Sequence, residues 1–516
     1  MYTRAARRAV PVIATNLERS QGSLLGRLAM ANSSQPKRPK VVTLENMNPH
    51  VRTMQYAVRG PIVARATAIE KELAQGEKKP FPDVVKCNIG DAHALGQKPI
   101  TFIRQVIALA TYPELLSSDM FPEDAKARAR RALSGCKNES VGSYSDSVGI
   151  EPIRQDIAAY IERRDGHPSD PNDIVLCAGA SEGIRSLLKC VVAGEGKTRS
   201  GVMIPIPQYP LYSASLAEFD AVQIGYFMDE ETGWSLKVSE LERAVTEARK
   251  HSNPVAIVII NPGNPTGQVL NRENIEDIIK FAHRENLYIV ADEVYQENIY
   301  AKGAKFHSFK KVLREMGPEY QTMELASFYS TSKGFMGECG LRGGYMEAIN
   351  MDTEVFGMLK KLVSAKLCPT TLGQITMECT VNPPREGEPS YELFMQEKTA
   401  VLQALREKAK LVAETFDAVD GVSCNEVMGA MYAFPRIHLP KKAVEKAKEL
   451  GMAADAFYCM RFLEEKGVCV VAGSGFGQVD GTYHFRMTIL PSVEKIKEVM
   501  ERFREFHSKF MEEYKD

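Results

Sequence analysis

Apolar and polar positions alternate with two different periods along the chain, and the changes of period predict a succession of helices and strands. The stretches 123–133 and 150–166 have apolar residues at helical spacing, and Gly166 ends the second. Short apolar runs rich in β-branched residues predict strands at 201–207, 221–227, 255–260, 287–293 and 324–330. An amphipathic helix is predicted over 274–286, between the third and fourth of these strands.

Buried strands separated by helices predict an α/β fold with a mainly parallel sheet that is covered on both faces. After the Pro- and Gly-rich stretch 381–390 the pattern changes to a long charged helix and then to short strands. We therefore expect a second, smaller α+β domain. The predicted parts are a basic leader at 1–40, an N-terminal arm or part of the small domain at 41–100, a large domain at 101–364 and the small domain at 365–516.

Composition and charge narrow the range of functions only slightly. The 516 residues are 44% apolar and 25% charged, with a formal charge of -1, so neither nucleic acid nor an anionic membrane surface is an expected partner. No apolar stretch approaches the roughly 20 residues of a spanning helix. The ten cysteines form no CxxC pair, which is typical of reduced thiols, and no residues have the spacing of metal ligands.

The first 40 residues differ from the rest in charge. They hold eight Lys or Arg residues against one acidic residue, Glu18. An Arg-rich, acid-poor leader is typical of a mitochondrial transit peptide, and a disordered basic tail of a cytoplasmic protein is the alternative. We therefore expect the mitochondrial matrix as the location, with the cytoplasm as the second possibility.

Several stretches with polar side chains follow predicted strands, at the sheet edge where α/β proteins bind ligands. In CAGASEGIRSLLKCVV (177–192), a turn of small residues leads into an apolar helix, whose free N–H groups favour an anion. Ala180, Ser181 and Glu182 would supply backbone donors, and Ser181 also a hydroxyl. A plain helix cap by Ser181 is the alternative.

Two proline-containing loops present further side chains. In PIPQYPLYSA (205–214), prolines fix a loop that carries Tyr209, which either stacks on a planar ligand or packs within the protein. INPGNPTGQVL (260–270) predicts a rigid turn. That turn either directs the amide of Asn264 to a ligand oxygen or serves as a turn alone.

A carboxylate follows another predicted strand. VADEVYQ (290–296) places Asp292 and Glu293 where the apolar run ends. Burying a carboxylate without a partner is costly, so the site requires a cation, such as the protonated ring nitrogen of a cofactor. Tyr295 comes three residues after Asp292 and is expected to reach the same ligand.

The stretch STSKGFMGECGLR (330–342) places Lys333 in a loop of small residues. Ser330, Lys333 and Arg342 combine a hydroxyl, an amine and a guanidinium, the last suited to phosphate. A solvated surface loop is the alternative. Because an adjacent carboxylate would hold the amine protonated, its absence beside Lys333 favours a lysine that reacts.

Together these side chains describe one ligand. It has a planar ring with a protonated nitrogen, a phenolic oxygen, a phosphate and a carbon that an amine attacks. Pyridoxal 5'-phosphate has this chemistry, and proteins bind it through a lysine and an acidic partner of the pyridinium nitrogen. The sequence therefore predicts pyridoxal phosphate as the cofactor.

The motifs NPGNPTG, ADEVY and STSK followed by an arginine resemble those of the fold-type I, class I and II aminotransferases. Longer stretches, among them NMNPHVRTMQYAVRGPIV and GAMYAFPRI, resemble the branch of that family that acts on alanine. The resemblance runs from about residue 41 to the C-terminus. It implies a mainly parallel seven-stranded sheet and ping-pong transamination between L-alanine and 2-oxoglutarate.

The resemblance also implies a role for each site residue. Lys333 would bind the cofactor covalently and transfer the proton, and Asp292 would pair with the pyridinium nitrogen. Tyr209 would stack on the ring, while Tyr295 and Asn264 would bind the phenolic oxygen. The other implied contacts are Ala180, Ser181, Glu182, Ser330 and Arg342 for the phosphate end of the cofactor, Gly90, Asn264 and Arg486 for the substrate, with Arg486 on its α-carboxylate, and Tyr144 for the cofactor of a neighbouring subunit, which implies a homodimer.

One interval departs from the family pattern, and several questions stay open. Nine residues separate Lys333 from Arg342, where many relatives have eight, and the turn 337–340 is expected to absorb the difference. GSGFG (473–477) lacks the context of a dinucleotide-binding loop and is predicted to be a turn near the site. No residue is assigned to the second carboxylate of glutamate.

Two other functions remain as alternatives. One is a different enzyme on the same cofactor, either another transaminase or one resembling aminocyclopropane-carboxylate synthase. The other is a regulator that binds the cofactor without turnover. The presence of Lys333, Asp292 and Arg486 together disfavours the regulator.

Overall fold

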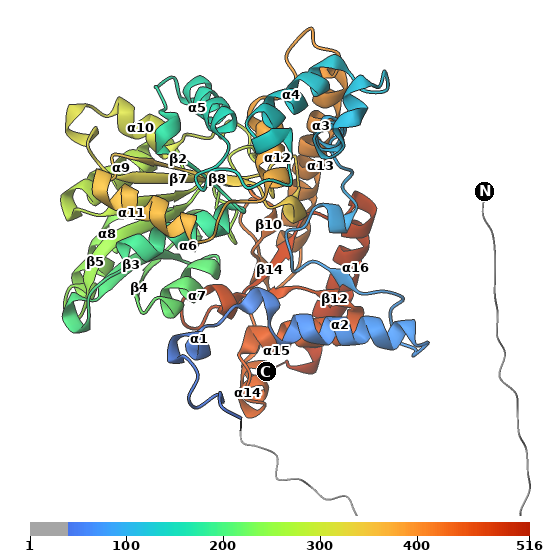
Figure 1. Ribbon diagram of the computed structural model, residues 1–516. Helices are drawn as coiled ribbons and strands as arrows, with labels where there is room; N and C mark the ends of the chain where they lie inside the picture. The colour runs from blue at the N-terminus through green and yellow to red at the C-terminus, as the bar shows by residue number, and fades with distance from the viewer. Residues whose placement is uncertain (1–39, 516) are drawn as a thin grey trace, which may run out of the picture. The chain divides into compact units, whose positions relative to one another are not determined.

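A seven-stranded sheet forms the centre of the fold (Figure 1). The computed structural model describes residues 40–515, so the predicted leader lies outside the described residues apart from its last position. In chain order the strands are β2 (Ile174–Cys177), β3 (Ser200–Ile206), β4 (Val222–Phe227), β5 (Asn253–Ile260), β6 (Tyr288–Asp292), β7 (Leu325–Ser330) and β8 (Gly344–Ile349). Their order across the sheet is β2-β8-β7-β6-β5-β3-β4.

The predicted mainly parallel sheet of seven strands is confirmed. The pairs β3–β4, β3–β5, β5–β6 and β6–β7 are parallel, and only β8 runs against its two neighbours, β2 and β7. The five strands predicted from apolar runs all lie in this sheet. The sequence reading missed β2 and β8, because β2 is only four residues long and β8 carries a glutamate, Glu347, in its interior.

Helices cover both faces of the sheet because successive strand residues point to opposite sides. Met203, Ile257 and Ile289 pack in one cluster with α8 (Val238–Ala248), α9 (Arg272–Glu285) and α10 (Phe309–Glu315). Their neighbours Val202, Val258 and Val290 pack in a second cluster, on the side of α6 (Ala180–Val191). Because both faces of these strands are buried, their sequences are continuous apolar runs. The other helices of this region are α7 (Leu211–Glu218) and α11 (Thr353–Ser364).

A third apolar cluster lies under a group of helices beside the sheet. It joins α3 (Thr101–Thr111), α4 (Glu123–Ser134), α5 (Glu151–Asp165) and α12 (Thr371–Val381). The predicted helices at 123–133 and 150–166 are confirmed as α4 and α5. Gly166 ends α5 in the left-handed conformation, with φ of 77°, which glycine adopts without strain.

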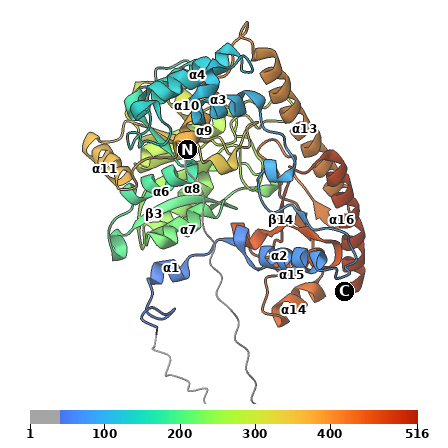
Figure 2. The ribbon, with the colours of Figure 1, turned by 45° about the vertical axis from the view of Figure 1, so that its right-hand side comes forward.

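The C-terminal region combines long helices with short strands. Helix α13 (Tyr391–Asp417) packs along α16 (Val493–Glu513), as both views show (Figures 1 and 2). Strands β10 (Tyr432–Ala433), β14 (Phe485–Thr488) and β13 (Val471–Ala472) form a small antiparallel sheet in that order. The remaining elements are β9 (Val422–Ser423), β11 (Arg436–Ile437), β12 (Val468–Cys469), α14 (Lys441–Glu449) and α15 (Ala454–Lys466).

The residues before the large sheet return to this C-terminal region. Strand β1 (Val85–Lys86) pairs in parallel with β12, and α2 (Pro61–Ala74) packs on α15 (Figure 2). The short helix α1 (Pro49–Thr53) precedes them. The ten 3₁₀ helices of residues 40–515 are η1 (Ala57–Arg59), η2 (His93–Leu95), η3 (Pro113–Ser117), η4 (Lys137–Glu139), η5 (Pro171–Asp173), η6 (Gly196–Thr198), η7 (Glu230–Thr232), η8 (Pro318–Tyr320), η9 (Cys339–Leu341) and η10 (Gly473–Phe476).

Residues 50–515 belong to one compact unit. The proposed division into a large and a small domain near residue 364 stays a prediction. Across the described residues, no helix combines the length and apolarity that crossing a bilayer requires.

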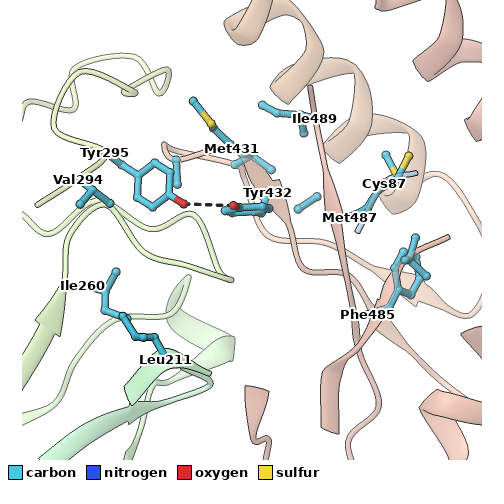
Figure 3. Close-up of a cluster of buried hydrophobic side chains, with 14 of the residues drawn as sticks. Cys87, Leu211, Ile260, Val294, Tyr295, Met431, Tyr432, Phe485, Met487 and Ile489 are labelled. Atoms are coloured by element: carbon cyan, nitrogen blue, oxygen red, sulfur yellow. Dashed lines mark hydrogen bonds between the residues drawn. The ribbon is translucent and has the colours of Figure 1, made fainter. Parts of the chain in front are cut away.

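One buried cluster connects the large sheet with the small one (Figure 3). Ile260, at the end of β5, and Leu211, at the start of α7, lie on one side. Met431, Tyr432 and Met487, from the C-terminal strands, lie on the other. This packing brings the carboxyl ends of the large sheet's strands close to β10 and β14, and the candidate site lies where they meet.

Candidate active site

A cavity of about 510 Å³ opens at the carboxyl ends of β5, β6 and β7. Parallel strands that end at one edge bring together side chains that are far apart in the chain. Eleven of the predicted site residues line this cavity: Gly90, Ala180, Ser181, Tyr209, Asn264, Asp292, Tyr295, Ser330, Lys333, Arg342 and Arg486. Glu182 and Tyr144 are not in its lining.

Lys333 lies in the loop that follows β7. Its Nζ donates a hydrogen bond to the carbonyl of Gly90 at 2.8 Å. No carboxylate oxygen of residues 40–515 lies within 4.0 Å of it. Gly90 permits this approach, because a Cβ there would lie 3.0 Å from Nζ and 2.1 Å from the hydroxyl of Tyr432. The amine is therefore held by a neutral carbonyl, which leaves it available to a ligand.

Asp292 ends β6 and is 4% exposed. Its Oδ2 accepts a hydrogen bond from the hydroxyl of Tyr212 at 2.8 Å, and its Oδ1 is buried without a hydrogen-bond partner among residues 40–515. Burial raises the pKa of Asp292 to about 6, although the bond from Tyr212 and the charge of Lys333 act in the opposite direction. A buried acceptor without a donor fits a protonated ring nitrogen.

Asp292→Asn is expected to stabilise the cofactor-free protein at neutral pH. The folded protein holds the Asp292 proton up to about pH 6, whereas the unfolded chain loses it near pH 4. The free energy of unfolding therefore falls by about 3 kcal/mol as the pH rises through that window. Asparagine avoids this loss, so urea unfolding should show a variant more stable than wild type at pH 7.5 and a shrinking difference toward pH 4.

The exposed Asp480→Asn is the matched control for this measurement, because it removes a carboxylate that lies at the surface. Its stability should follow that of wild type at each pH. An Asp292→Asn effect of the same size at pH 4 and at pH 7.5 would contradict the assignment to the buried charge.

The opposite end of the cavity is suited to an anion. The first turn of α6 presents Ser181 there, and its cap residue is Gly179, not Ser181, so the plain-cap alternative is wrong. Arg342 Nη2 donates to the carbonyl of Ala178 at 3.0 Å, directly before the helix. Ser330 also lines the cavity, and its Oγ donates to the carbonyl of Gly343 at 3.2 Å.

Arg342 reaches this position despite the nine-residue interval from Lys333. Residue 342 is in the left-handed conformation, with φ of 57°, after the 3₁₀ turn η9. Its Nη1 donates to the carbonyl of Cys339 at 3.1 Å. A Cβ on Gly179 would lie 2.4 Å from Nη2, so a glycine is needed where the guanidinium meets the helix start.

Aromatic hydroxyls surround the middle of the cavity. Tyr295 donates to the hydroxyl of Tyr432 at 3.2 Å (Figure 3). Burial alone would raise the pKa of Tyr432, but the charges of Lys333 and Arg486 and the bond from Tyr295 hold it below the ordinary tyrosine value. The hydroxyl of Tyr209 lies 2.8 Å from that of Tyr56, the residue directly before η1.

Arg486, on β14, is 1% exposed. Its Nη1 donates to Asn264 Oδ1 at 3.0 Å and its Nη2 to the carbonyl of Asn88 at 2.7 Å, while Nε is buried with no hydrogen-bond partner in the described part of the chain. The guanidinium carbon lies 4.1 Å from the ring centroid of Tyr432 and 4.8 Å from that of Phe476. The turn GSGFG, which supplies Phe476, therefore lies beside this arginine.

Two predicted residues lie elsewhere. The backbone N–H of Glu182 donates to the carbonyl of Gly179 at 3.1 Å, and its carboxylate accepts from the N–H of Ala178 at 2.6 Å, so its predicted backbone donor is already occupied. Tyr144 lies in a surface segment and is 65% exposed. Its role toward a neighbouring subunit stays a prediction.

The sequence reading missed three contacts of the site. Tyr212, the partner of Asp292, lies three residues after Tyr209, in the first turn of α7, and this spacing is the available signal. Tyr432 lies in the stretch GAMYAF, whose only signal in the sequence is its resemblance to a family motif. Asn88 contributes a backbone carbonyl, for which no sequence signal exists.

The comparisons with known proteins agree with this arrangement. A family model described as aminotransferase class I and II matches residues 106–503. The chain belongs to this aminotransferase family. It is 61% identical to alanine aminotransferase 2-like of Danio rerio, over 94% of this chain and 88% of that protein.

Two further relatives extend the comparison. The aminotransferase is 48% identical to a probable mitochondrial alanine aminotransferase of Dictyostelium discoideum, over 92% of this chain and 90% of that protein. A solved structure described as alanine aminotransferase from Pyrococcus furiosus has a TM-score of 0.71 at 22% identity, covering 90% of this chain and 99% of that one. The latter likeness supports the fold.

Pyridoxal phosphate is the cofactor of this aminotransferase family, and the cavity fits it. The unpartnered Oδ1 of Asp292 suits the ring nitrogen, and Lys333 suits the carbonyl carbon. Arg342 and the start of α6 suit the phosphate. A transaminase that uses this cofactor is therefore consistent with both the family and the geometry.

Proposed function

We propose that the enzyme transfers the amino group of L-alanine to 2-oxoglutarate, giving pyruvate and L-glutamate. One observation carries the proposal: a lysine without a carboxylate partner, a buried carboxylate with a free oxygen and a buried arginine all line one cavity. The relatives named as alanine aminotransferases, at up to 61% identity over most of the chain, support the choice of substrate.

Each residue has a defined task in this reaction. When bound, pyridoxal phosphate withdraws electrons from the substrate carbon that carries the amino group, so that its proton can be removed. Lys333 Nζ would take this proton and later give it back, acting as base and then as acid. The Oδ1 of Asp292 accepts the ring N–H and keeps the nitrogen protonated.

The remaining side chains hold the two partners in place. Arg486 binds the substrate α-carboxylate with a guanidinium that lies near the rings of Tyr432 and Phe476. Tyr295 and Asn264 would bind the phenolic oxygen of the cofactor, and Tyr209 would stack on its ring. Ser181, Ser330, Arg342 and the backbone of Ala180 bind the phosphate.

The two half-reactions use the same residues in turn. Pyruvate leaves after the first, and 2-oxoglutarate then enters with its α-carboxylate on Arg486. Lys333 moves the proton in the reverse direction, and glutamate leaves. This is a ping-pong sequence, so neither substrate requires the other to be present in the cavity.

A coupled assay tests the proposal. Pyruvate formation from L-alanine is followed through lactate dehydrogenase and NADH oxidation, and it should require 2-oxoglutarate. Protein freed of cofactor should be inactive and should recover when pyridoxal phosphate is added. Activity confined to other amino donors would refute the alanine assignment, and pyruvate release without 2-oxoglutarate over many turnovers would refute transamination.

We also propose that the enzyme is a homodimer. The exposed side chain of Tyr144 supports this, because a large aromatic residue at the surface is suited to an interface. Sedimentation equilibrium should give twice the 57.3 kDa of the chain, and a monomer at micromolar concentration would refute the proposal.

We propose that the enzyme is located in mitochondria. The basic first 40 residues support it, as does the relative from Dictyostelium discoideum that is named mitochondrial. A fluorescent fusion of these residues should enter mitochondria, and a fusion that remains in the cytoplasm would favour the second possibility.

A further inference from the structure

The proposed reaction poses a recognition problem in the substrate part of the cavity. The methyl group of alanine is neutral and small, whereas glutamate and 2-oxoglutarate carry a second carboxylate. A carboxylate that leaves water needs a cationic partner. The same cavity must therefore pair a cation with the second carboxylate of glutamate. That cation must also tolerate alanine, whose neutral methyl group cannot pair with it.

Four cationic side chains line the cavity: Arg59, Lys333, Arg342 and Arg486. Two of them already bond other groups, and a third is needed for the reaction itself. Arg342 bonds two backbone carbonyls beside the start of α6, and Arg486 bonds Asn264 and Asn88. Lys333 must remain free for the proton transfer. Arg59 is the one of these four cations to which the proposed reaction has given no role.

We propose that Arg59 binds the side-chain carboxylate of glutamate and of 2-oxoglutarate. This inference rests on the proposed alanine–glutamate reaction and deepens it, because it names the residue that distinguishes the two amino acids. It makes Arg59 a specificity-determining residue for the dicarboxylate half-reaction.

The position of Arg59 within the cavity supports this role. Arg59 lies in η1, which packs on β13 and on η10. Strand β13 pairs with β14, where Val471 lies opposite Arg486. The segment that carries Arg59 therefore lies next to the strands that hold the proposed α-carboxylate site, whereas Arg342 and α6 form the phosphate end.

The backbone of this segment is anchored. The hydroxyl of Tyr56 lies 2.8 Å from that of Tyr209, and the side chain of Val58 is buried. The N–H of Arg59 donates to the carbonyl of Tyr56 at 3.1 Å. The start of the Arg59 side chain is thus fixed at the cavity wall.

The guanidinium itself is unconstrained. It is exposed, and within the part of the chain that the structure describes it has neither an ion pair nor a side-chain hydrogen bond. The acidic Asp91 also lines the cavity, but its Oδ1 accepts from the N–H of Ala94 at 3.1 Å and it forms no ion pair with Arg59. An arginine at the mouth can remain in water beside alanine and can pair with the second carboxylate of glutamate.

Half-reactions of the cofactor-loaded enzyme test the inference. Arg59→Met removes the charge and keeps the length of the side chain. The half-saturating concentrations of glutamate and 2-oxoglutarate, read from the absorbance change of the bound cofactor, should rise about 10- to 100-fold. Those of alanine and pyruvate should stay within about twofold of wild type, since neither carries a second carboxylate. Arg59→Lys should retain part of the glutamate preference.

A binding measurement without turnover gives an independent readout. Calorimetry compares glutarate, which has two carboxylates, with butyrate, which has one. The wild-type enzyme should prefer glutarate, and the preference should weaken with added salt. Arg59→Met should lose it, and Arg504→Met should keep it, because Arg504 is an exposed arginine of α16 that does not line the cavity.

The outcomes separate this inference from the proposed function. If the wild-type enzyme does not react with alanine, the proposed function fails. If it does, and Arg59→Met changes the alanine and glutamate half-reactions equally or changes neither, the assignment of Arg59 is wrong. Should Arg59→Met fail to fold, Arg59→Gln and Arg59→Lys are measured in the same way, with alanine turnover as the test of an intact site.

Discussion

Lys333→Ala is expected to lower alanine-dependent transamination by at least about 10⁴-fold, because the substitution removes both the covalent attachment and the base that moves the proton. The coupled alanine and 2-oxoglutarate assay measures this loss. The fold should survive, since the amine makes one hydrogen bond, to the carbonyl of Gly90. The free energy of unfolding of the cofactor-free protein should therefore fall by about 1 kcal/mol at most, so its thermal midpoint should change little.

Lys302→Ala is the matched control, because Lys302 is exposed and does not line the cavity. Its activity should equal that of wild type. Equal activity of Lys333→Ala and the wild-type enzyme would refute the mechanism, whatever substrate the enzyme prefers. Exogenous methylamine offers a further check, since a small amine that enters the space left by the side chain should restore part of the lost rate.

Arg486→Met is expected to lower kcat/KM by about 10²- to 10³-fold for alanine and for glutamate alike. Both amino acids present the same α-carboxylate, and the variant removes the guanidinium that binds it. The substitution also leaves Asn264 Oδ1 and the carbonyl of Asn88 without donors. Arg486→Lys should be intermediate, because it restores a charge without the planar pair of donors. Steady-state kinetics with each amino donor measures the effect.

The comparison with Arg59→Met distinguishes the proposed roles of the two arginines. Loss of Arg486 should affect both amino acids by the same factor, whereas loss of Arg59 should affect glutamate alone. An Arg486→Met variant that keeps full kcat/KM for alanine would remove this arginine from the substrate site. Arg504→Met serves again as the surface control, with unchanged kinetics expected for both donors.

The buried network around Tyr432 holds Arg486, the proposed substrate arginine, in place. Arg486 lies over the Tyr432 ring, and the Tyr432 hydroxyl accepts from Tyr295, which follows Asp292 by three residues. The proposed α-carboxylate site and the proposed ring-nitrogen site are therefore connected by direct contacts. A substrate that binds Arg486 is held in a fixed position relative to the residues that bind the cofactor.

Much of the catalytic set could be predicted from the sequence because its signals are local. Asp292, Asn264 and Lys333 each follow an apolar run within a few residues, and such runs predict strands in a parallel sheet. The covered sheet, the order of its five apolar strands along the chain, and the cofactor all follow from patterns of that length. Strand β8 was not predicted because its interior holds Glu347. The charge of Glu347 is compensated by an ion pair with the buried Lys310, which comes from another element.

The sequence by itself determined which residues we propose for the chemistry of the site: a lysine for the reaction, an acidic partner for a ring nitrogen, and an anion site at a helix start. Only the tertiary structure decided which groups complete these residues. Tyr212 reaches Asp292 across 80 positions, Gly90 reaches Lys333 across 243, and Asn88 reaches Arg486 across 398. Periodicity and turn chemistry act over a few residues, whereas these contacts arise from the packing of strands and loops that are distant in the chain. For the same reason Arg59 had no assignable role until the fold placed it in the cavity wall.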